Sequence, residues 1–485
     1  MFEDSAKGQG SGKAAAVIEI VSLYAAQNKI YPRSVSGIFS NWRWGFVWFT
    51  QILFYGLPWL EWNSRQAVLF DLASRRFYIF GLVLYPQDFI YLTGMLLISA
   101  YALFLFTAVA GRLWCGFACP QTVYTEIFIW IEKLFEGDRQ SRIKLDAKPW
   151  GLNKLLRKGG KHGAWIAMGL WTGFSFVGYF TPIHSLWAES FSWGFGPWEW
   201  FWVLFYGFAT YGNAGFMREQ VCKYMCPYAR FQSAMFDKDT LIISYDAERG
   251  EPRGSRNRKV NAQSAGLGSC IDCTLCVQVC PTGIDIRKGL QYECIGCAAC
   301  IDVCDGVMDK MAYPRGLIRY DTENGLNQHL SPAQKFRRLF RPRVLFYSLV
   351  LLLLIGSLLG SLLFLRSPVK LDVVRDRGVM ARIVDDGFVE NLYRLQIMNA
   401  TELPQQCSVD VTGLHGISLA RPIEVSVAPA QARWVTVAVH LPPQTAVMAG
   451  IGAHPIMFKL HAGLDKAVSP SSTLVQEKST FIVPR

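Results

Sequence analysis

Long apolar stretches alternate with polar, basic connections over the first three quarters of the chain. Five of these stretches lack charged residues in their interiors and approach the ~20 residues that a helix needs to cross a bilayer. They are Trp44–Leu60, Phe89–Gly111, Gly163–Ile183, Phe201–Met217 and Val344–Leu365. The pattern therefore predicts an α-helical integral membrane protein with five transmembrane helices.

The connections between these stretches differ in their content of Lys and Arg. Residues 112–162 contain ten basic residues and residues 218–343 contain nineteen, whereas residues 184–200 contain none. Basic loops stay on the cytoplasmic side of a membrane. We therefore expect residues 1–43 and both basic connections inside the cell, and the tail after Arg366 outside.

The period of the pattern changes from helical to alternating after the last apolar stretch. Alternating runs, separated by Pro and Gly clusters, include Tyr393/Leu395/Ile397, Ile423/Val425/Val427, Val435/Val437/Val439/Leu441 and Ile456/Phe458/Leu460. Short alternating strands over residues 366–485 predict an immunoglobulin-like β-sandwich. Cys407 shares the period of Val409 and Val411, so we expect it to face the core of this domain.

Composition narrows the class of protein further. Of the 485 residues, 51% are hydrophobic and only 18% are charged, which excludes intrinsic disorder and a coiled-coil rod. The net charge of +12 could indicate nucleic acid, but the basic residues are concentrated in the predicted cytoplasmic connections, where they set membrane orientation. We therefore expect a lipid bilayer, and no nucleic acid, as the partner of this charge.

Two cysteine runs carry the strongest chemical signal. Cys270-x2-Cys273-x2-Cys276-x3-Cys280-Pro281 is followed by Cys294-x2-Cys297-x2-Cys300-x3-Cys304. In two-cluster ferredoxins, three cysteines of a run bind one [4Fe–4S] cluster and the fourth binds the other. This rule assigns the first cluster to Cys270, Cys273, Cys276 and Cys304, and the second to Cys294, Cys297, Cys300 and Cys280.

Structural zinc is the alternative occupant, since paired C-x2-C motifs also form four-cysteine zinc sites. Eight cysteines in two copies of one fourfold spacing favour iron–sulfur clusters. Asp305 stands where the pattern has a second proline, which removes no ligand. The reducing cytoplasm, where the charge pattern places this segment, also keeps thiols free.

A second motif, C-x3-C-P, occurs at the predicted cytoplasmic ends of two apolar stretches. It consists of Cys115 and Cys119 before Pro120, and of Cys222 and Cys226 before Pro227. Cysteines four residues apart on a helix point to one face, and the proline stops or kinks the helix. If the two halves pack together, four thiolates converge near the membrane surface. Such soft ligands suit Cu(I), iron or an iron–sulfur centre, whereas the alternative is buried cysteines that only pack.

These motifs together resemble the cytochrome c oxidase accessory proteins of the CcoG (FixG/RdxA) family, membrane polyferredoxins related to the NapH and NosR group. The resemblance covers nearly the whole chain. Besides the cysteine motifs, it rests on Ile30-Tyr31-Pro32-Arg33, on Arg76–Gly81 and on Pro86-Gln87-Asp88.

The resemblance implies a bacterial inner-membrane cupric reductase that supports copper delivery to a cbb3-type cytochrome oxidase. Copper ions, copper-delivery proteins and the oxidase assembly machinery would then be partners, and a cytoplasmic donor would supply electrons. The helix-end thiols Cys115, Cys119, Cys222 and Cys226 would form the catalytic metal site. Two alternatives stay open: a quinol-linked electron conduit, and an assembly scaffold whose clusters are structural.

The domain organisation expected from these patterns has five parts. A cytoplasmic segment (1–43) precedes a four-helix membrane region (44–217), and a cytoplasmic segment (218–343) holds the two-cluster ferredoxin-like domain at about 262–312. The fifth transmembrane helix (344–365) leads to the periplasmic β-domain (366–485).

Overall fold

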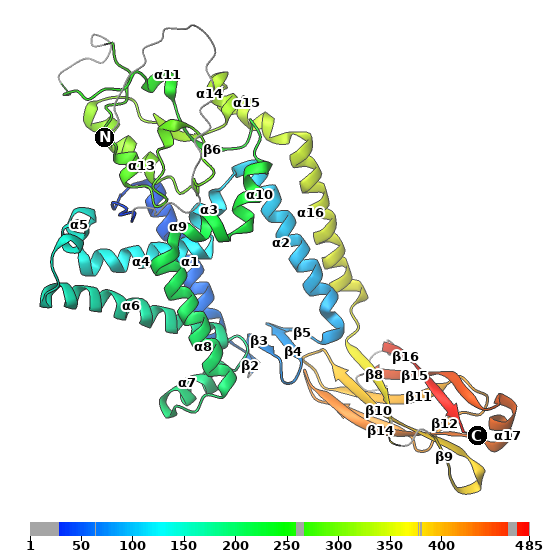
Figure 1. Cartoon of the computed structure of the whole chain (residues 1–485). Coiled ribbons are helices and arrows are strands. Elements are labelled where there is room, and N and C mark those ends of the chain that lie inside the picture. The colour runs from blue at the N-terminus through cyan, green and yellow to red at the C-terminus, as the bar shows by residue number, and fades with distance from the viewer. Residues whose placement is uncertain are drawn as a thin grey trace, which may run out of the picture.

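The computed structural model describes residues 29–63, 65–258, 266–376, 378, 381–463 and 473–484. Short helices and loops form one end of the molecule, long helices form its middle, and a β-sandwich forms the other end (Figure 1). The helices of the middle region are α1 (Ile38–Gly56), α2 (Phe89–Ala110), α3 (Leu113–Phe117), α4 (Pro120–Glu136), α5 (Arg139–Ala147), α6 (Leu152–Val177), α7 (Ile183–Ser192), α8 (Pro197–Thr210) and α16 (Pro342–Gly360).

Two pairs of long helices pack through glycines. On α6, a Cβ atom on Gly173 would lie 2.2 Å from the carbonyl oxygen of Val203 on α8, and one on Gly169 would lie 2.7 Å from that of Gly207. Small residues let helix backbones approach in this way inside membranes. α2 and α16 also lie side by side (Figure 1), and a Cβ on Gly94 would lie 3.0 Å from Leu358 Cδ1.

Two of the five predicted crossings form helices long and apolar enough to span a bilayer within the described residues. They are Pro86–Ala110 and Pro342–Leu365. The other three predicted segments are helical, but α8 ends at Thr210 before a π-helical stretch, Tyr211–Met217, and α6 begins within the basic connection. The number of five crossings therefore stays a prediction.

The ferredoxin-like part lies at the end of the helices opposite the β-sandwich (Figure 1). Strands β6 (Ile242–Tyr245) and β7 (Ile318–Asp321) pair antiparallel beside two helices, α12 (Leu275–Gln278) and α13 (Ala299–Met311). The remaining helices of this part are α9 (Arg218–Gln220), α10 (Pro227–Met235), α11 (Ala247–Gly250), α14 (Glu323–Asn327) and α15 (Pro332–Arg337).

The C-terminal part is the immunoglobulin-like sandwich that the alternating pattern predicts. One sheet has the strand order β12-β14-β10-β8, with β9 also paired to β10, and the other has the order β13-β11-β15-β16. The strands are β8 (Val369–Arg375), β9 (Arg382–Ile383), β10 (Val389–Asn399), β11 (Gln405–Thr412), β12 (Ser418–Leu419), β13 (Ile423–Val427), β14 (Ala432–Leu441), β15 (Gly452–Gly463) and β16 (Thr473–Val483). Cys407 is 2% exposed in the core between the sheets, as expected.

A small antiparallel sheet joins the sandwich to the helices. Its strands are β3 (Val68–Asp71), β4 (Arg76–Ile79) and β5 (Leu82–Leu84), while β1 (Glu61–Trp62) and β2 (Arg65–Gln66) form a separate pair. The Tyr85 hydroxyl donates to the carbonyl oxygen of Asn399 over 3.0 Å, and Lys370 forms an ion pair with Asp88. These contacts attach the sandwich to the start of α2.

Candidate iron–sulfur and thiol centres

Two cavities in the ferredoxin-like part are lined by the cysteines of the two runs. Cys270, Cys273, Cys276 and Cys304 line the first cavity. Cys280, Cys294, Cys297 and Cys300 line the second, and Cys276 also touches its wall. Each cavity thus presents one set of four sulfurs that the ferredoxin spacing groups together. The sequence placed the same residues in the same two sets.

The two cysteine runs share one backbone conformation. Asp272 and Thr274 have φ values of 51° and 56° in the first run, and Gly296 and Ala298 have values of 72° and 59° in the second. Thr274 and Ala298 directly precede α12 and α13. Left-handed residues turn the chain tightly, so three cysteines of each run can surround one cavity.

The fourth cysteine of each run lies in the other cavity. Cys304 is carried there by α13, and Cys280 follows α12. Helix α13 continues past Cys304 to Met311 because Asp305 replaces the proline of the first run. The Asp305 carboxylate accepts the Gly316 N–H over 2.9 Å, which attaches the middle of this helix to the loop before β7.

Several of the cluster-run thiols are strongly desolvated. Burial, reinforced by neighbouring sulfurs, raises the pKa of Cys304 and Cys294 to about 12. Burial raises the pKa of Cys276 to about 11. Metal ligation requires the thiolate, so metal binding by these thiols would release protons and stabilise the deprotonated form. Ile284 and Ile286 give the second cavity apolar walls.

The C-x3-C-P motifs do not lie on continuous helices. α3 ends at Phe117, and Cys119 is the extended N-cap of α4, with Pro120 in its first position. Cys226 likewise precedes Pro227 at the start of α10. The expectation that each pair shares one face of a single helix is therefore wrong. A residue before proline avoids the helical conformation, so the backbone breaks between the two cysteines.

The break nevertheless leaves all four helix-end thiols close together. Burial raises the pKa of Cys115 to about 11, and Cys119 and Cys226 contribute to the rise. Burial raises the pKa of Cys222 to about 12, with contributions from the other three thiols. Within the described ranges, no group of three or more His, Cys, Asp or Glu side chains has the arrangement of a site for a single metal ion. This holds for the cluster cysteines as well as for the helix-end thiols.

The helix-end thiols contact the loop that carries the second cysteine run. A Cβ atom on Gly116 would lie 2.5 Å from the carbonyl oxygen of Gly296, so the two backbones touch. Cys115 and Cys222 pack against the buried group that contains Ile295 and Cys297. The second cavity therefore lies next to the helix-end thiols, and the first lies beyond it.

Two buried arginines that sequence reasoning missed lie beside the second cysteine run. Arg112 donates to the Cys294 carbonyl oxygen over 3.1 Å. Burial lowers the pKa of Arg112, while Cys115, Cys294 and Cys222 act to raise it. Arg43 interacts electrostatically with the Cys297 sulfur. The sequence does point to Arg112, because it is a charged residue between an apolar stretch and Cys115.

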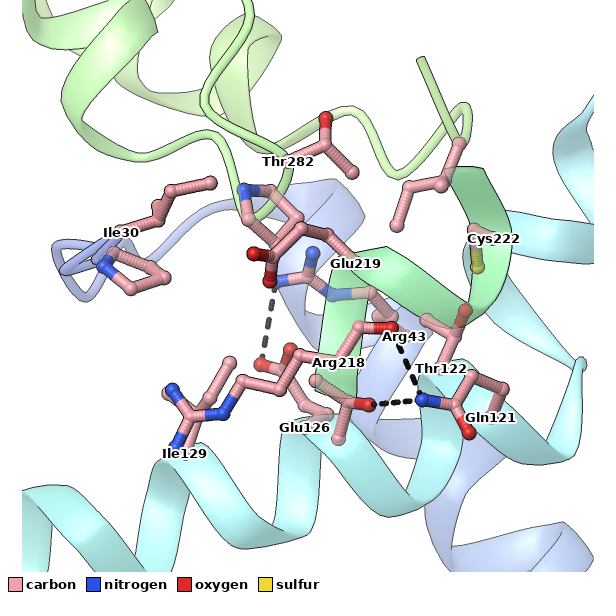
Figure 2. A pocket seen from close by; sticks show the side chains of 14 residues that line it. Ile30, Arg43, Gln121, Thr122, Glu126, Ile129, Arg218, Glu219, Cys222 and Thr282 are labelled. Carbon is pink, nitrogen blue, oxygen red and sulfur yellow. Dashed lines mark hydrogen bonds and ion pairs between the residues drawn. The ribbon is translucent and has the colours of Figure 1, made fainter. Parts of the chain in front are cut away.

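A narrow crevice beside Cys222 has both charged and apolar walls. Its lining includes Gln121, Glu126, Arg218 and Glu219 as well as Cys222 and Arg43. Figure 2 shows the ion pair between Arg43 and Glu126, with 3.4 Å between nitrogen and oxygen. One helix-end thiol, Cys222, therefore lies beside charged side chains between α4 and the cluster loops.

An ion-pair network supports the second C-x3-C-P motif. Glu132 on α4, 2% exposed, pairs with Arg142 at 2.7 Å, Arg218 at 3.0 Å and Lys161 at 3.7 Å. Arg218 has a φ of 33° and stands between two π-helical stretches. The Gln121 amide donates to the Arg218 carbonyl oxygen over 3.2 Å. Such π-helical irregularities often occur at functional sites.

Three protein-family descriptions match the chain. A 4Fe-4S dicluster domain matches residues 217–323, a 4Fe-4S binding domain matches residues 92–137, and an IG-like fold at the C-terminal of FixG matches residues 359–484. The first match contains all eight cysteines of the two runs, and the second contains Cys115 and Cys119.

Relatives match over most of their lengths. Nitrogen fixation protein FixG of Rhizobium meliloti is 39% identical over 448 residues, which cover 86% of this chain and 85% of that protein. Protein RdxB of Cereibacter sphaeroides is 40% identical over 420 residues, covering 84% and 88%. The solved structure of a FixG-related protein from Vibrio parahaemolyticus is 26% identical, covers 24% of this chain and 97% of its own, and has a TM-score of 0.20.

The paired cysteine cavities and the family matches define an iron–sulfur electron-transfer protein with an immunoglobulin-like C-terminal domain. The identity to FixG, RdxB and RdxA over most of the chain shows its family. The chain belongs to the FixG/RdxA family.

Proposed function

We propose that this chain takes electrons from a cytoplasmic one-electron donor and reduces Cu(II) to Cu(I) at the helix-end thiols. The contact between Gly116 and Gly296 is the observation that carries this proposal, because it brings these thiols beside the second cysteine cavity. The copper reduced in this way would supply copper-delivery proteins during assembly of a cbb3-type cytochrome oxidase.

The proposed ligands of the first [4Fe–4S] cluster are Cys270, Cys273, Cys276 and Cys304. Those of the second are Cys280, Cys294, Cys297 and Cys300. Each cluster supplies one-electron transfer when bound. Cys273 is exposed, whereas Cys297 is buried next to the helix-end thiols. This arrangement supports electron entry at the first cluster and exit through the second.

The helix-end thiols would bind the copper substrate and stabilise its reduced form. Soft thiolates prefer Cu(I) to Cu(II), so Cys115, Cys119, Cys222 and Cys226 raise the tendency of bound Cu(II) to accept an electron. One electron from the donor converts one Cu(II) to one Cu(I). The raised pKa values of Cys115 and Cys222 mean that ion binding by these thiols releases protons.

Replacement of the four helix-end cysteines by Ser tests the site. We expect the variant to retain both clusters, measured as iron content and EPR signal, and to lose Cu(II) reduction, measured with a Cu(I)-specific chelator. Cys407→Ser is the matched control, since Cys407 lies in the distant sandwich core. Undiminished copper reduction in the fourfold variant would refute the assignment.

A third iron–sulfur centre is a second candidate for the same thiols. The 4Fe-4S binding domain matched to residues 92–137 favours it, because that range contains Cys115 and Cys119. Iron analysis distinguishes the candidates. Two clusters contain about eight iron atoms per chain, and a third centre adds iron that disappears in the fourfold Cys→Ser variant.

The proposed location is the bacterial inner membrane, with five crossings, cytoplasmic clusters and a periplasmic sandwich. The two apolar helices and the nineteen basic residues of 218–343 support this orientation, since basic connections stay cytoplasmic. Protease added to intact spheroplasts should digest the sandwich and spare residues 218–343. Digestion of the cluster segment from outside would reverse the orientation.

A further inference from the structure

Two buried guanidinium groups lie beside the second cysteine run and come from outside the ferredoxin-like loops. Arg43 is on α1 and Arg112 stands between α2 and α3. Arg43 is 5% exposed and Arg112 is 7% exposed. Within the described part of the chain, the Nε atom of each is buried without a hydrogen-bond partner. Burying a cation is costly unless nearby negative charge compensates it.

Arg112 lies between the helix-end thiols and the second cysteine run. Its guanidinium donates to the carbonyl oxygens of Tyr292 and Cys294, and to that of Ala229 over 2.5 Å. The ionisable groups that act on it are Cys115, Cys294, Cys222 and Glu293. The carbonyl groups hold the guanidinium in position without neutralising it, and the Glu293 carboxylate offsets part of its charge, so the remainder acts on the sulfurs on either side.

Arg43 approaches the second cysteine run from α1. Its guanidinium interacts electrostatically with the Cys297 sulfur and with Asp302, and it pairs with Glu126 on α4 at 3.4 Å. This separation is longer than that of a close charge-assisted hydrogen bond. The Glu126 pair therefore compensates only part of the Arg43 charge.

The first cavity has a different charge environment. Arg287 lines it, but its guanidinium is paired with Asp285 at 2.7 Å and with Asp272. Arg287 acts on Cys276, but its two carboxylate partners offset its charge at the first set of sulfurs. Asp305 also lies near Cys304. The two cysteine sets therefore differ in the buried positive charge that faces them.

We infer that Arg43 and Arg112 tune the second cluster by raising its reduction potential above the value that its burial alone would give. A cluster gains one negative charge on reduction, and removal from water disfavours that charge. Charge and hydrogen bonding around the sulfurs are established means of tuning such potentials. The inference rests on the proposed ligand set of the second cluster and is independent of copper reduction.

Potentiometric EPR titration of the full-length protein in detergent tests this role. The solution is held at the midpoint potential of the wild-type second cluster. In Arg112→Gln and Arg43→Gln, we expect the reduced-to-oxidised ratio of that cluster to fall at least tenfold, equivalent to 59 mV for one electron. The ratio of the first cluster should stay unchanged.

Two further variants separate charge from structure. Arg112→Lys keeps the positive charge without the planar fork, so it should recover most of the wild-type ratio. Arg341→Gln is the matched control, because Arg341 is also partly buried, donates to a backbone carbonyl, that of Ala108, and pairs with Asp237 at 3.2 Å. It should leave both clusters unchanged.

An unchanged ratio in Arg43→Gln with both clusters assembled would overturn the inference for Arg43, and the same result in Arg112→Gln would overturn it for Arg112. If Arg112→Gln fails to assemble the second cluster, Arg112→Lys and Arg43→Gln decide the question. The fourfold Cys→Ser variant of the helix-end thiols separates this test from the proposed function. It should lose copper reduction while the effect of Arg43→Gln on the second cluster persists.

Discussion

Gly116 and Gly296 approach so closely that a Cβ atom on Gly116 would lie 2.5 Å from the Gly296 carbonyl oxygen. The first residue belongs to a C-x3-C-P motif and the second to a ferredoxin-like loop. The φ of 72° at Gly296 favours glycine, and a Cβ atom there would lie 2.9 Å from the Arg112 carbonyl oxygen. The two redox motifs thus meet through backbone that permits no side chain on Gly116.

Gly116→Ala should push the two motifs apart. Because the clashing atom is backbone, the change should destabilise their contact by about 1–3 kcal/mol, as overpacking does. Electron transfer from the clusters to copper should slow, because the donor and acceptor separate. Stopped-flow oxidation of dithionite-reduced protein by Cu(II) measures the rate, and thermal unfolding in detergent measures the stability.

Gly306→Ala is the control for this change. Gly306 is on α13 of the same cluster domain, and a Cβ there meets nothing within 4 Å. Alanine should stabilise this helix by about 0.5–1 kcal/mol and leave the rate of copper reduction unchanged. Equal rates in Gly116→Ala and the wild type would contradict a role for the Gly116 contact.

Removal of the Glu132 carboxylate should destabilise the protein. Glu132→Gln removes the carboxylate that Arg142 and Arg218 share, whereas Lys161 keeps its ion pair with Glu136 at 2.9 Å. Breaking a buried ion pair from one side costs about 3–5 kcal/mol, so a clear loss of thermal stability is expected. Lys133→Gln, on the exposed face of the same helix, should have little effect.

The same carboxylate should make stability depend on pH. Burial would raise the pKa of Glu132, but Arg218, Arg142 and Lys161 lower it overall. Its contribution is therefore present above the unfolded-state pKa of about 4.3 and is lost as pH falls through the folded-state value. Denaturant unfolding between pH 7 and pH 3 should show this acid loss in the wild type. The acid loss should be smaller in Glu132→Gln, and an equal loss in that variant would contradict the prediction.

Much of the fold could be predicted because its signals are local. The alternation through Tyr393, Leu395 and Ile397 places them in β10, where all three are fully buried. Sequence spacing alone also grouped the eight cluster-run cysteines into the sets that line the two cavities. Both patterns repeat at short range, so neighbouring residues carry the information.

The rest of the site depends on contacts between distant segments. Arg43 reaches Cys297, and Gly116 reaches Gly296, only after α1 and α3 have docked on the cluster loops. The periodicity of the sequence carries no information about such contacts. The expected helix through Cys115 and Cys119 was wrong for a different reason. The i, i+4 spacing suggested a helix, but the conformational restriction before Pro120 prevailed.

Asp302 should contribute to the docking of α1 on the cluster domain. Its carboxylate accepts the N–H groups of Phe39 over 3.2 Å and of Ser40 over 2.7 Å, at the start of α1. A negative charge at a helix N-terminus is stabilising. Asp302→Asn should therefore destabilise the protein by about 1–2 kcal/mol in thermal unfolding.

Asp309→Asn is the matched control on the same helix. Asp309 pairs with Arg315 on the exposed surface, and exposed pairs contribute little to stability. Its replacement should leave the unfolding temperature unchanged. Equal effects of the two substitutions would mean that Asp302 does not anchor α1.

Cys407 should be chemically inert in the folded protein. Burial raises its pKa to about 11, so roughly one thiol in a thousand is ionised at pH 8. Iodoacetamide should label it slowly at pH 8 and rapidly after denaturation, as measured by mass spectrometry of the β11 peptide. Asp410→Cys, exposed on the same strand, supplies a control thiol that should react at once. If native Cys407 is labelled as fast as that control, Cys407 is accessible to metal ions. Slow labelling would mean that Cys407 does not bind copper in the folded protein, so the helix-end thiols stay the proposed copper site.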